Sequence, residues 1–372
     1  MGKDHQKHTK LVLRENDNFA HNEIAILGTK CSIIEVFVQK MSKILQKTSK
    51  IAYLDAFHAD DITAPFYDTF TAHPSGNLSS NSAAQLNEYN ERIRFANYDL
   101  LFINGNHYQG AKQILILDPE KEASVLKRLE QLDRVQFVIK LKDDATYFDF
   151  LTEKYPTIKN LKCYHIEEVE TIANHINNLI NEKISPVQGL VLAGGKSTRM
   201  GKDKTTLDYH GKSQLEHTVS LLKDNLLSTF VSVAAGQKAE KFEIIQDKFV
   251  DLGAFGAICS AFQQNPNKAW LVLASDLPFV TIDLVKKLIQ NRNPKKMATA
   301  IKGQSKEFVE PLITIYEPKA YPILLSYLAQ GYSCPRKVLI NSDVEIVEVE
   351  DEFVRNVNTP EEYERAINEI RN

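Results

Sequence analysis

The stretch LVLAGGKSTRMGKDKTTL, residues 190–207, decides how the second half of this chain is built. The apolar run at 189–193 predicts a buried strand, which stops at the glycine pair Gly194 and Gly195. Four cations follow around a third glycine: Lys196, Arg199, Lys202 and Lys204. Backbone N–H groups in such a loop can bind a compact anion, and the cations neutralise its charge. The stretch therefore predicts a polyphosphate-binding loop that opens a domain near the middle of the chain.

The overall composition is that of an ordinary globular protein. The chain has 372 residues, 43% of them hydrophobic and 25% charged, which favours two domains with real cores. A formal net charge of −3 gives no reason to expect binding to nucleic acid or to an anionic membrane. No apolar run has the length of a signal peptide or a membrane span. The four cysteines are far apart in sequence and lack zinc-ligand spacing, so we expect free thiols in a cytoplasmic protein.

A short polar linker at 181–188, in which Pro186 stops a helical pattern, predicts the domain boundary. We expect a first domain at 1–183 and a second at 184–372. Short apolar runs alternate with helical patterns in both: 23–27, 51–54, 100–103, 114–117 and 135–139, then 189–193, 230–234, 270–274, 297–301 and 312–316. This alternation predicts the α/β class, with two Rossmann-like three-layer domains whose sheets are mostly parallel. Residues 55–82 have no sustained period and predict a loop region.

The first domain has GTKCSIIE, residues 28–35, between its first strand and first helix, where a nucleotide-binding loop would lie. Such a loop needs a second glycine, a lysine and a hydroxyl residue, but Ile33, Ile34 and Glu35 occupy those positions. We therefore expect no nucleotide hydrolysis there. The order of strand, loop and helix, followed by YDLLFING at 98–105, resembles the molybdopterin-guanine dinucleotide biosynthesis accessory proteins (B type), which are P-loop GTPase-like. The resemblance implies a degenerate P-loop domain that acts as a scaffold or docking module.

The second domain has five motifs in a fixed order. They are LAGGKSTRMGKDK at 192–204 with Gly211 and Lys212 after it, DKFVDLGAFG at 247–256, ASDLP at 274–278, EPL at 310–312 and NVNTP at 356–360. Together they resemble the signature of the molybdenum cofactor guanylyltransferases (A type), which are nucleotidyltransferases with a Rossmann-like fold. The resemblance covers essentially the whole domain. It implies an enzyme that transfers GMP from GTP to a molybdopterin-type cofactor with Mg²⁺ and releases pyrophosphate.

The resemblance also implies roles for individual residues. The nucleotide would be bound by the backbone of Leu192, Ala193, Gly194 and Gly195, by the side chains of Arg199, Lys204 and Asp247, and through Mg²⁺ on Asp276. Arg199 and Lys204 would offset charge on the departing pyrophosphate, and Asp276 would be the metal ligand and catalytic residue. Arg336, Asn356 and Asn358 would face the acceptor. Partners implied beyond GTP and the cofactor are molybdoenzymes or other cofactor-biosynthesis proteins.

Three departures from the family pattern leave alternatives open. Ala234 stands where the family has an asparagine that helps to read the base, Ser213 replaces a proline, and residues 253–255 read Gly-Ala-Phe instead of Gly-Pro-Leu. Base specificity is therefore open, and a cytidylyltransferase or a sugar-phosphate nucleotidyltransferase on the same fold is the alternative enzyme. A nonenzymatic cofactor-binding chaperone is the alternative of another class.

Overall fold

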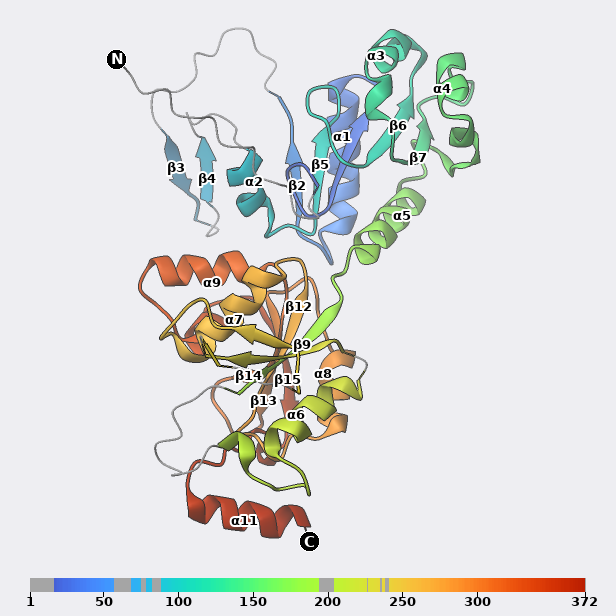
Figure 1. Cartoon of the computed structure of the whole chain (residues 1–372). Coiled ribbons are helices and arrows are strands. Elements are labelled where there is room, and N and C mark those ends of the chain that lie inside the picture. Colours follow the sequence, from blue (N-terminus) through green and yellow to red (C-terminus); the bar gives the residue numbers. More distant parts are fainter. Residues whose placement is uncertain are drawn as a thin grey trace, which may run out of the picture. The chain divides into compact units, whose positions relative to one another are not determined.

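The computed structural model describes residues 17–56, 68–74, 78–81, 88–193, 204–225, 227–234, 236–237 and 241–371. The chain divides into two compact units, Met1–Lys183 and Ile184–Asn372. Each unit contains a largely or wholly parallel sheet with helices on both faces, which confirms the predicted α/β class (Figure 1). Among the described residues, no helix combines the length and apolar character needed to cross a bilayer.

The first unit is built on a six-stranded sheet in the order β2-β5-β1-β6-β7-β8, in which every pairing is parallel. The strands are β1 (Glu23–Leu27), β2 (Ile51–Leu54), β5 (Leu100–Asn104), β6 (Gln113–Leu117), β7 (Val135–Lys140) and β8 (Cys163–His165). One face packs on α1 (Cys31–Leu45) and α5 (Val169–Glu182), and the other packs on α2 (Glu88–Phe95), α3 (Glu122–Lys127) and α4 (Asp149–Lys154). Burial on both faces explains why the central strands are continuous apolar runs.

Two segments of the first unit differ from the sequence expectation. The expected loop region contains a small antiparallel pair, β3 (Thr69–Ala72) and β4 (Leu78–Asn81), which is separate from the main sheet. The charged segment 119–132 predicts a single helix, but it forms one short helix, α3, between 3-10 turns at Pro119–Lys121 and Leu129–Gln131. Pro119 fixes the first turn, and the Asp118 side chain caps it by accepting the N–H of Glu120.

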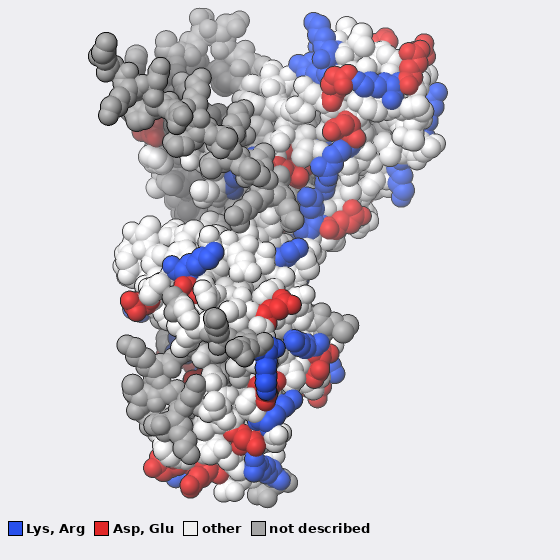
Figure 2. Space-filling model, viewed as in Figure 1, with Lys and Arg blue, Asp and Glu red and all other residues white. Residues whose placement is uncertain are grey.

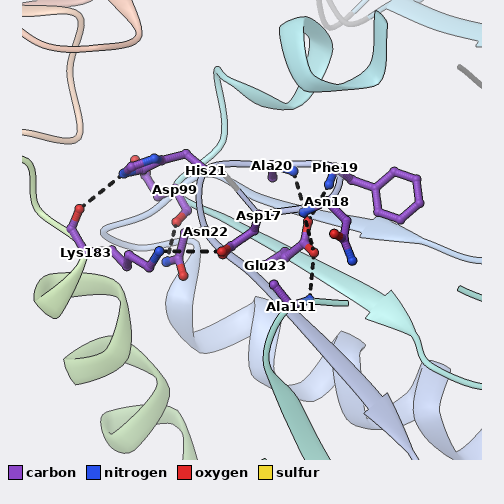
Figure 3. A network of polar contacts seen from close by, with 10 residues as sticks. All are labelled: Asp17, Asn18, Phe19, Ala20, His21, Asn22, Glu23, Asp99, Ala111 and Lys183. Atoms are coloured by element: carbon purple, nitrogen blue, oxygen red, sulfur yellow. Dashed lines mark hydrogen bonds and ion pairs between the residues drawn. The ribbon is translucent and has the colours of Figure 1, made fainter. Parts of the chain in front are cut away.

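A buried carboxylate organises the turn that leads into β1 (Figure 3). Glu23 is fully buried, and its side chain accepts backbone N–H groups from Asn18 (3.0 Å), Phe19 (2.7 Å), Ala20 (3.0 Å) and Ala111 (2.8 Å). Burial raises the pKa of Glu23, and the four N–H donors oppose that rise by stabilising the charged form. The Glu23 carboxylate thus satisfies four backbone N–H donors at the amino end of the central strand, β1.

The same turn holds the end of the first unit. Lys183, which follows α5, has its ammonium group 3.7 Å from the Asp17 carboxylate, and its carbonyl oxygen is 3.4 Å from His21 Nε2 (Figure 3). Asn22 donates its side-chain N–H to the carbonyl oxygen of Asp99 at 3.1 Å. The residue at which the first unit stops is therefore tied to the turn ahead of its central strand.

The second unit is built on a seven-stranded sheet in the order β11-β10-β9-β12-β14-β13-β15. The strands are β9 (Val187–Leu192), β10 (Thr229–Val233), β11 (Ile244–Gln246), β12 (Ala269–Ala274), β13 (Ala298–Gly303), β14 (Glu310–Tyr316) and β15 (Val344–Val349). All pairings are parallel except those of β14, which runs antiparallel to both of its neighbours. The sheet is thus mostly parallel, as predicted.

Helices cover both faces of this second sheet (Figure 1). One face packs on α6 (Gln214–Lys223) and α8 (Ile282–Gln290), and the other on α7 (Gly253–Gln264), α9 (Ala320–Ala329) and α10 (Pro335–Ile340). The C-terminal helix α11 (Pro360–Arg371) packs through Ala366 on Leu207, Tyr209 and Phe279. On the face shown in Figure 2, basic and acidic side chains are interspersed over the described parts of both units.

Ser213 and Thr359 are each followed three residues later by a glutamate, a pattern that predicts a helix N-cap, and both caps are confirmed. Ser213 precedes α6, and its hydroxyl oxygen accepts the N–H of Glu216 at 3.2 Å. Thr359 precedes α11 and accepts the N–H of Glu362 at 3.2 Å, while the Glu362 carboxylate accepts the N–H of Thr359 at 3.1 Å. The second pair is a complete capping box, in which each side chain satisfies a backbone donor of the other residue.

A buried ion pair joins the start and the middle of the second unit. Arg292 donates through Nε and Nη2 to the two carboxylate oxygens of Glu317, both at 2.7 Å. The same Nη2 donates to the carbonyl oxygen of Ser185, just ahead of β9, at 2.7 Å. The side chains of Arg292 and Glu317 are only 13% and 1% exposed. Both side chains are removed from water, so the loss of either partner would leave the other charge buried and unpaired, which would destabilise the unit.

Candidate active site

The carboxyl ends of the parallel strands of the second unit meet at one edge of the sheet. Leu192, the last residue of β9, is in register with Ser232 of β10 and with Ala274 of β12. Val233 of β10 is in register with Gln246, the last residue of β11. In open α/β sheets this edge is where ligands bind. The residues that directly follow these strands are therefore candidates for a site.

Two carboxylates lie close together at this edge. Asp276 follows β12, and its carbonyl oxygen accepts the N–H of Val357 at 3.3 Å, which brings the C-terminal segment beside it. Glu310 begins β14, whose antiparallel course starts at the edge where β12 ends. Burial raises the pKa of Glu310, Arg336 opposes the rise, and the nearby Asp276 charge adds to it. The two carboxylates are therefore close enough for the charge of Asp276 to disfavour the charged form of Glu310.

Asp247, directly after β11, is held by the neighbouring helix. Its N–H donates to the carbonyl oxygen of Val233 at 2.9 Å, and its carboxylate lies 3.1 Å from the hydroxyl of Ser260 in α7. Burial raises the pKa of Asp247, and the hydroxyl lowers it. Asp251 is exposed in a left-handed turn, with φ at 62°. Of the two aspartates in this motif, Asp247 is the one fixed at the strand end.

A cavity of about 780 Å³ opens beside Glu310. It is lined by Gly303, Lys306, Glu307, Phe308, Glu310, Arg336, Asp351, Glu352, Val354, Arg355, Asn356 and Glu369. Arg336 Nη2 lies 3.2 Å from the Glu310 carboxylate. The guanidinium of Arg355 stacks on the ring of Phe279, 3.9 Å from its centroid, and pairs with Glu369. Both arginines are therefore held in place at the cavity wall by an acidic partner.

The predicted acceptor residues do not all occupy the same place. Arg336 and Asn356 line the cavity. Asn358 is not among the lining residues, and its backbone N–H donates to the Glu362 carboxylate at 2.7 Å, ahead of α11. The sequence motifs assign no role to Lys306, Arg355 or Glu310, although Glu310 opens the EPL motif. A carboxylate directly before proline at the start of an apolar strand is the signal that could have singled it out.

The glycine-rich motif is only partly described. Leu192 is buried at the end of β9, and the N–H of Ala193 donates to the carbonyl oxygen of Ser232 at 3.2 Å. Gly194, Gly195 and Arg199 lie outside the described residues. Lys204 begins a 3-10 turn, Lys204–Thr206, of which the backbone is described.

The corresponding edge of the first unit offers no room for a triphosphate loop. β1 ends at Leu27 and α1 begins at Cys31, so Gly28, Thr29 and Lys30 are the whole connection. Gly28 has φ at 99°, and a Cβ atom there would lie 2.2 Å from the carbonyl oxygen of Ile116. Lys30 pairs with Glu120 at 2.7 Å. A phosphate loop of the Gly-x4-Gly-Lys-Ser/Thr type spans eight residues, so this short turn cannot supply one.

Among the described residues, no group of three or more His, Cys, Asp and Glu side chains lies close enough to hold a metal ion. A site made of one or two carboxylates remains compatible with Mg²⁺, because that ion usually completes its shell with water and substrate phosphates.

The second unit is similar in sequence to known proteins. Residues 189–345 match the family described as the MobA-like NTP transferase domain. A molybdenum cofactor guanylyltransferase from Xanthomonas euvesicatoria pv. vesicatoria is 30% identical over 191 residues, which is 50% of this chain and 96% of that protein. The crystal structure of molybdopterin-guanine dinucleotide biosynthesis protein A from Archaeoglobus fulgidus has 26% identity and a TM-score of 0.42, and the match covers 49% of this chain and 97% of that one.

Another relative, longer than the two proteins above, matches a similar share of this chain. The molybdenum cofactor biosynthesis bifunctional protein from Synechocystis sp. is 32% identical over 184 residues. The match covers 48% of this chain and 53% of that protein, so the chain spans about half the length of this relative.

Proposed function

The chain belongs to the family of molybdenum cofactor guanylyltransferases through its second unit, and on this premise we propose that the unit transfers GMP from GTP to a molybdopterin-type acceptor. The observation that carries the proposal is the pair of carboxylates, Asp276 and Glu310, at the carboxyl edge of the sheet beside a cavity walled by Arg336. Transfer between two anionic substrates needs opposite charges on the protein and a rigid arrangement of both.

Mg²⁺ fits this pair of carboxylates. The Asp276 charge raises the pKa of Glu310, and a divalent cation held by Asp276 would offset the repulsion between the two carboxylates. Asp276 would hold the ion, which when bound polarises phosphoryl oxygens and aligns the reacting groups. Glu310 lies beside Asp276. Its ion pair with Arg336 would keep the guanidinium at the cavity wall until the acceptor binds.

GTP would lie along the ends of β9, β10 and β11. The backbone of Leu192, Ala193, Gly194 and Gly195 and the side chains of Arg199 and Lys204 would hold the triphosphate. Asp247, fixed by Ser260, would contact the nucleoside part. At Ala234, where the family has an asparagine, the Gln237 side chain accepts the backbone N–H at 3.3 Å, so a carboxamide still lies at this strand end. We infer that Gln237 reads the base.

The acceptor would occupy the cavity, with its phosphate directed at Arg336 and Asn356. Arg336 would exchange Glu310 for this phosphate, while Asn358 fixes the segment that carries Asn356 by donating its N–H to Glu362. An acceptor phosphate oxygen then attacks the α-phosphorus of GTP, the bond to the bridging β-phosphate oxygen breaks, and pyrophosphate leaves. No protein nucleophile is required, because both reactants are held in line.

For the first unit we propose a scaffold or docking role toward other proteins of cofactor biosynthesis or a recipient molybdoenzyme. The three-residue turn after β1 supports this, because it leaves no space for a triphosphate loop. In this role the first unit would position partner proteins and would take no part in nucleotide chemistry.

The test uses the purified full chain with Mg²⁺ and each of GTP, CTP, ATP and UTP, with and without molybdopterin, and measures pyrophosphate release. We expect release with GTP only when the acceptor is present. Release with CTP alone would replace the guanylyl assignment by the cytidylyl one. No release with any pair would leave the nonenzymatic chaperone as the better explanation.

A further inference from the structure

The first unit contains a cysteine and a histidine in hydrogen-bond contact, well separated in sequence from the proposed transfer site. Cys31 is the first residue of α1, and His107 lies in the turn after β5. The distance from Cys31 Sγ to His107 Nε2 is 3.3 Å, and Asn106 Nδ2 lies 3.5 Å from the same sulfur. β1 and β5 are neighbours in parallel register, which is why the turns that follow them meet at one edge.

Hydrogen bonds to backbone carbonyl oxygens hold the two turns in place. Asn106 Nδ2 donates to the carbonyl oxygen of Thr29 at 2.9 Å, and the Asn106 carbonyl oxygen accepts Arg128 Nη2 at 2.5 Å. The N–H of Gly105 donates to the carbonyl oxygen of Ile26 at 2.8 Å. The contact between sulfur and imidazole is therefore built on a fixed backbone rather than on two long, mobile side chains.

A nucleophile and a base within hydrogen-bond reach of each other are the arrangement that activates a thiol. The amino end of the fifteen-residue helix α1 stabilises negative charge that develops on the sulfur. Cys31 is half-buried and His107 is exposed, so a small reagent can approach the pair. Neither residue has a part in the proposed nucleotidyl transfer.

Two other cysteines provide a comparison within the same molecule. Cys163 and Cys334 are both exposed, whereas Cys259 is buried. Cys334 also precedes a helix, α10, yet in the described part of the chain no histidine hydrogen bonds with it. A difference in reactivity between Cys31 and Cys334 would therefore report on the histidine.

We propose that Cys31 is a thiol-exchange site that takes a small disulfide. Sγ attacks one sulfur of the disulfide, the S–S bond breaks, and a mixed disulfide forms on Cys31. His107 takes the proton of the thiol and passes it to the departing sulfur, which leaves as a free thiol. The disulfide supplies the oxidising equivalents, and exchange needs only the nucleophile, the base and access.

The mixed disulfide on Cys31 would persist until an external thiol reduces it. The other cysteine of the first unit, Cys163, begins β8, which is the third strand away from β1. That separation is about 14 Å at the usual strand spacing. A disulfide needs Cα atoms within about 7 Å, so Cys163 cannot resolve the mixed disulfide.

The experiment exposes the full chain to glutathione disulfide at pH 7 and measures thiolation at each cysteine over time by peptide mass spectrometry. We expect Cys31 to react roughly 100-fold faster than Cys334, at the low end of what a positioned base contributes. His107→Ala should lower the Cys31 rate to that of Cys334 and leave Cys334 unchanged. His165→Ala, which removes another histidine of the first unit, is the matched control and should alter neither rate.

Two results would overturn the proposal. One is equal reaction of Cys31 and Cys334 in the unaltered protein, a comparison that requires no variant. The other is an unchanged Cys31 rate in His107→Ala. His107→Gln provides a second variant that keeps a polar side chain but cannot carry the proton, and it should react as slowly as His107→Ala.

Discussion

Removing the guanidinium of Arg292 should strongly destabilise the second unit. In Arg292→Met the Glu317 carboxylate, 1% exposed, loses both of its 2.7 Å donors, and the Ser185 carbonyl loses a third. A buried charge left without its partner costs about 3–5 kcal/mol. Much of this cost comes from the stranded carboxylate, so Arg292→Met/Glu317→Leu should recover most of the loss.

The assay is urea unfolding followed by tryptophan fluorescence. The chain has one tryptophan, Trp270, fully buried in β12, so the signal reports on the second unit alone. Lys286→Met breaks an exposed pair, in which Lys286 is 51% and Asp283 88% exposed, and should cost less than about 0.5 kcal/mol. A loss below about 1 kcal/mol for Arg292→Met, or a double variant less stable than the single one, would refute the reasoning.

Four further predictions concern the proposed site and its surroundings. Asp276→Ala should lower turnover by roughly 100-fold or more, as expected for loss of a metal ligand, with an unchanged Trp270 unfolding curve; normal turnover would remove Asp276 from the site. Gln237→Ala should lower the preference for GTP over ATP in competition assays, and an unaltered ratio would assign base reading elsewhere. Lys30→Ala should leave pyrophosphate release unchanged, because the first turn holds no phosphate. Burial, followed by the charges of His210 and Lys212, lowers the pKa of His217 from 6.5 to about 4. The unfolded chain then binds more protons between these values, so the second unit loses stability as the pH falls from about 6.5 toward 4. His217→Phe keeps a ring against His210 and should flatten this slope in urea titrations; an equal slope would show that other groups cause it.

The sequence predicted those parts of the fold that depend on local pattern. The strand at 23–27 matches β1 because both of its faces are buried, and the caps at Ser213 and Thr359 depend on residues three positions apart. Helix α7 was not expected. Eight of its twelve residues are buried, so it has no single apolar stripe, and it begins with a glycine.

Features that depend on long-range packing could not be predicted in the same way. Gly256 is required because a Cβ atom there would lie 2.2 Å from the carbonyl oxygen of Phe249, a contact made only after the turn has folded. The position of Glu310 beside Asp276 depends on the reversed direction of β14. Periodicity identifies an apolar strand but contains no information on its direction, so this second carboxylate emerged only from the topology.

The most direct test of the central proposal is the mass of the acceptor after incubation with the purified chain, Mg²⁺, and equal concentrations of GTP and CTP. We predict that molybdopterin gains one GMP moiety for each pyrophosphate released. An acceptor of unchanged mass, or one that gains CMP, would contradict the assignment.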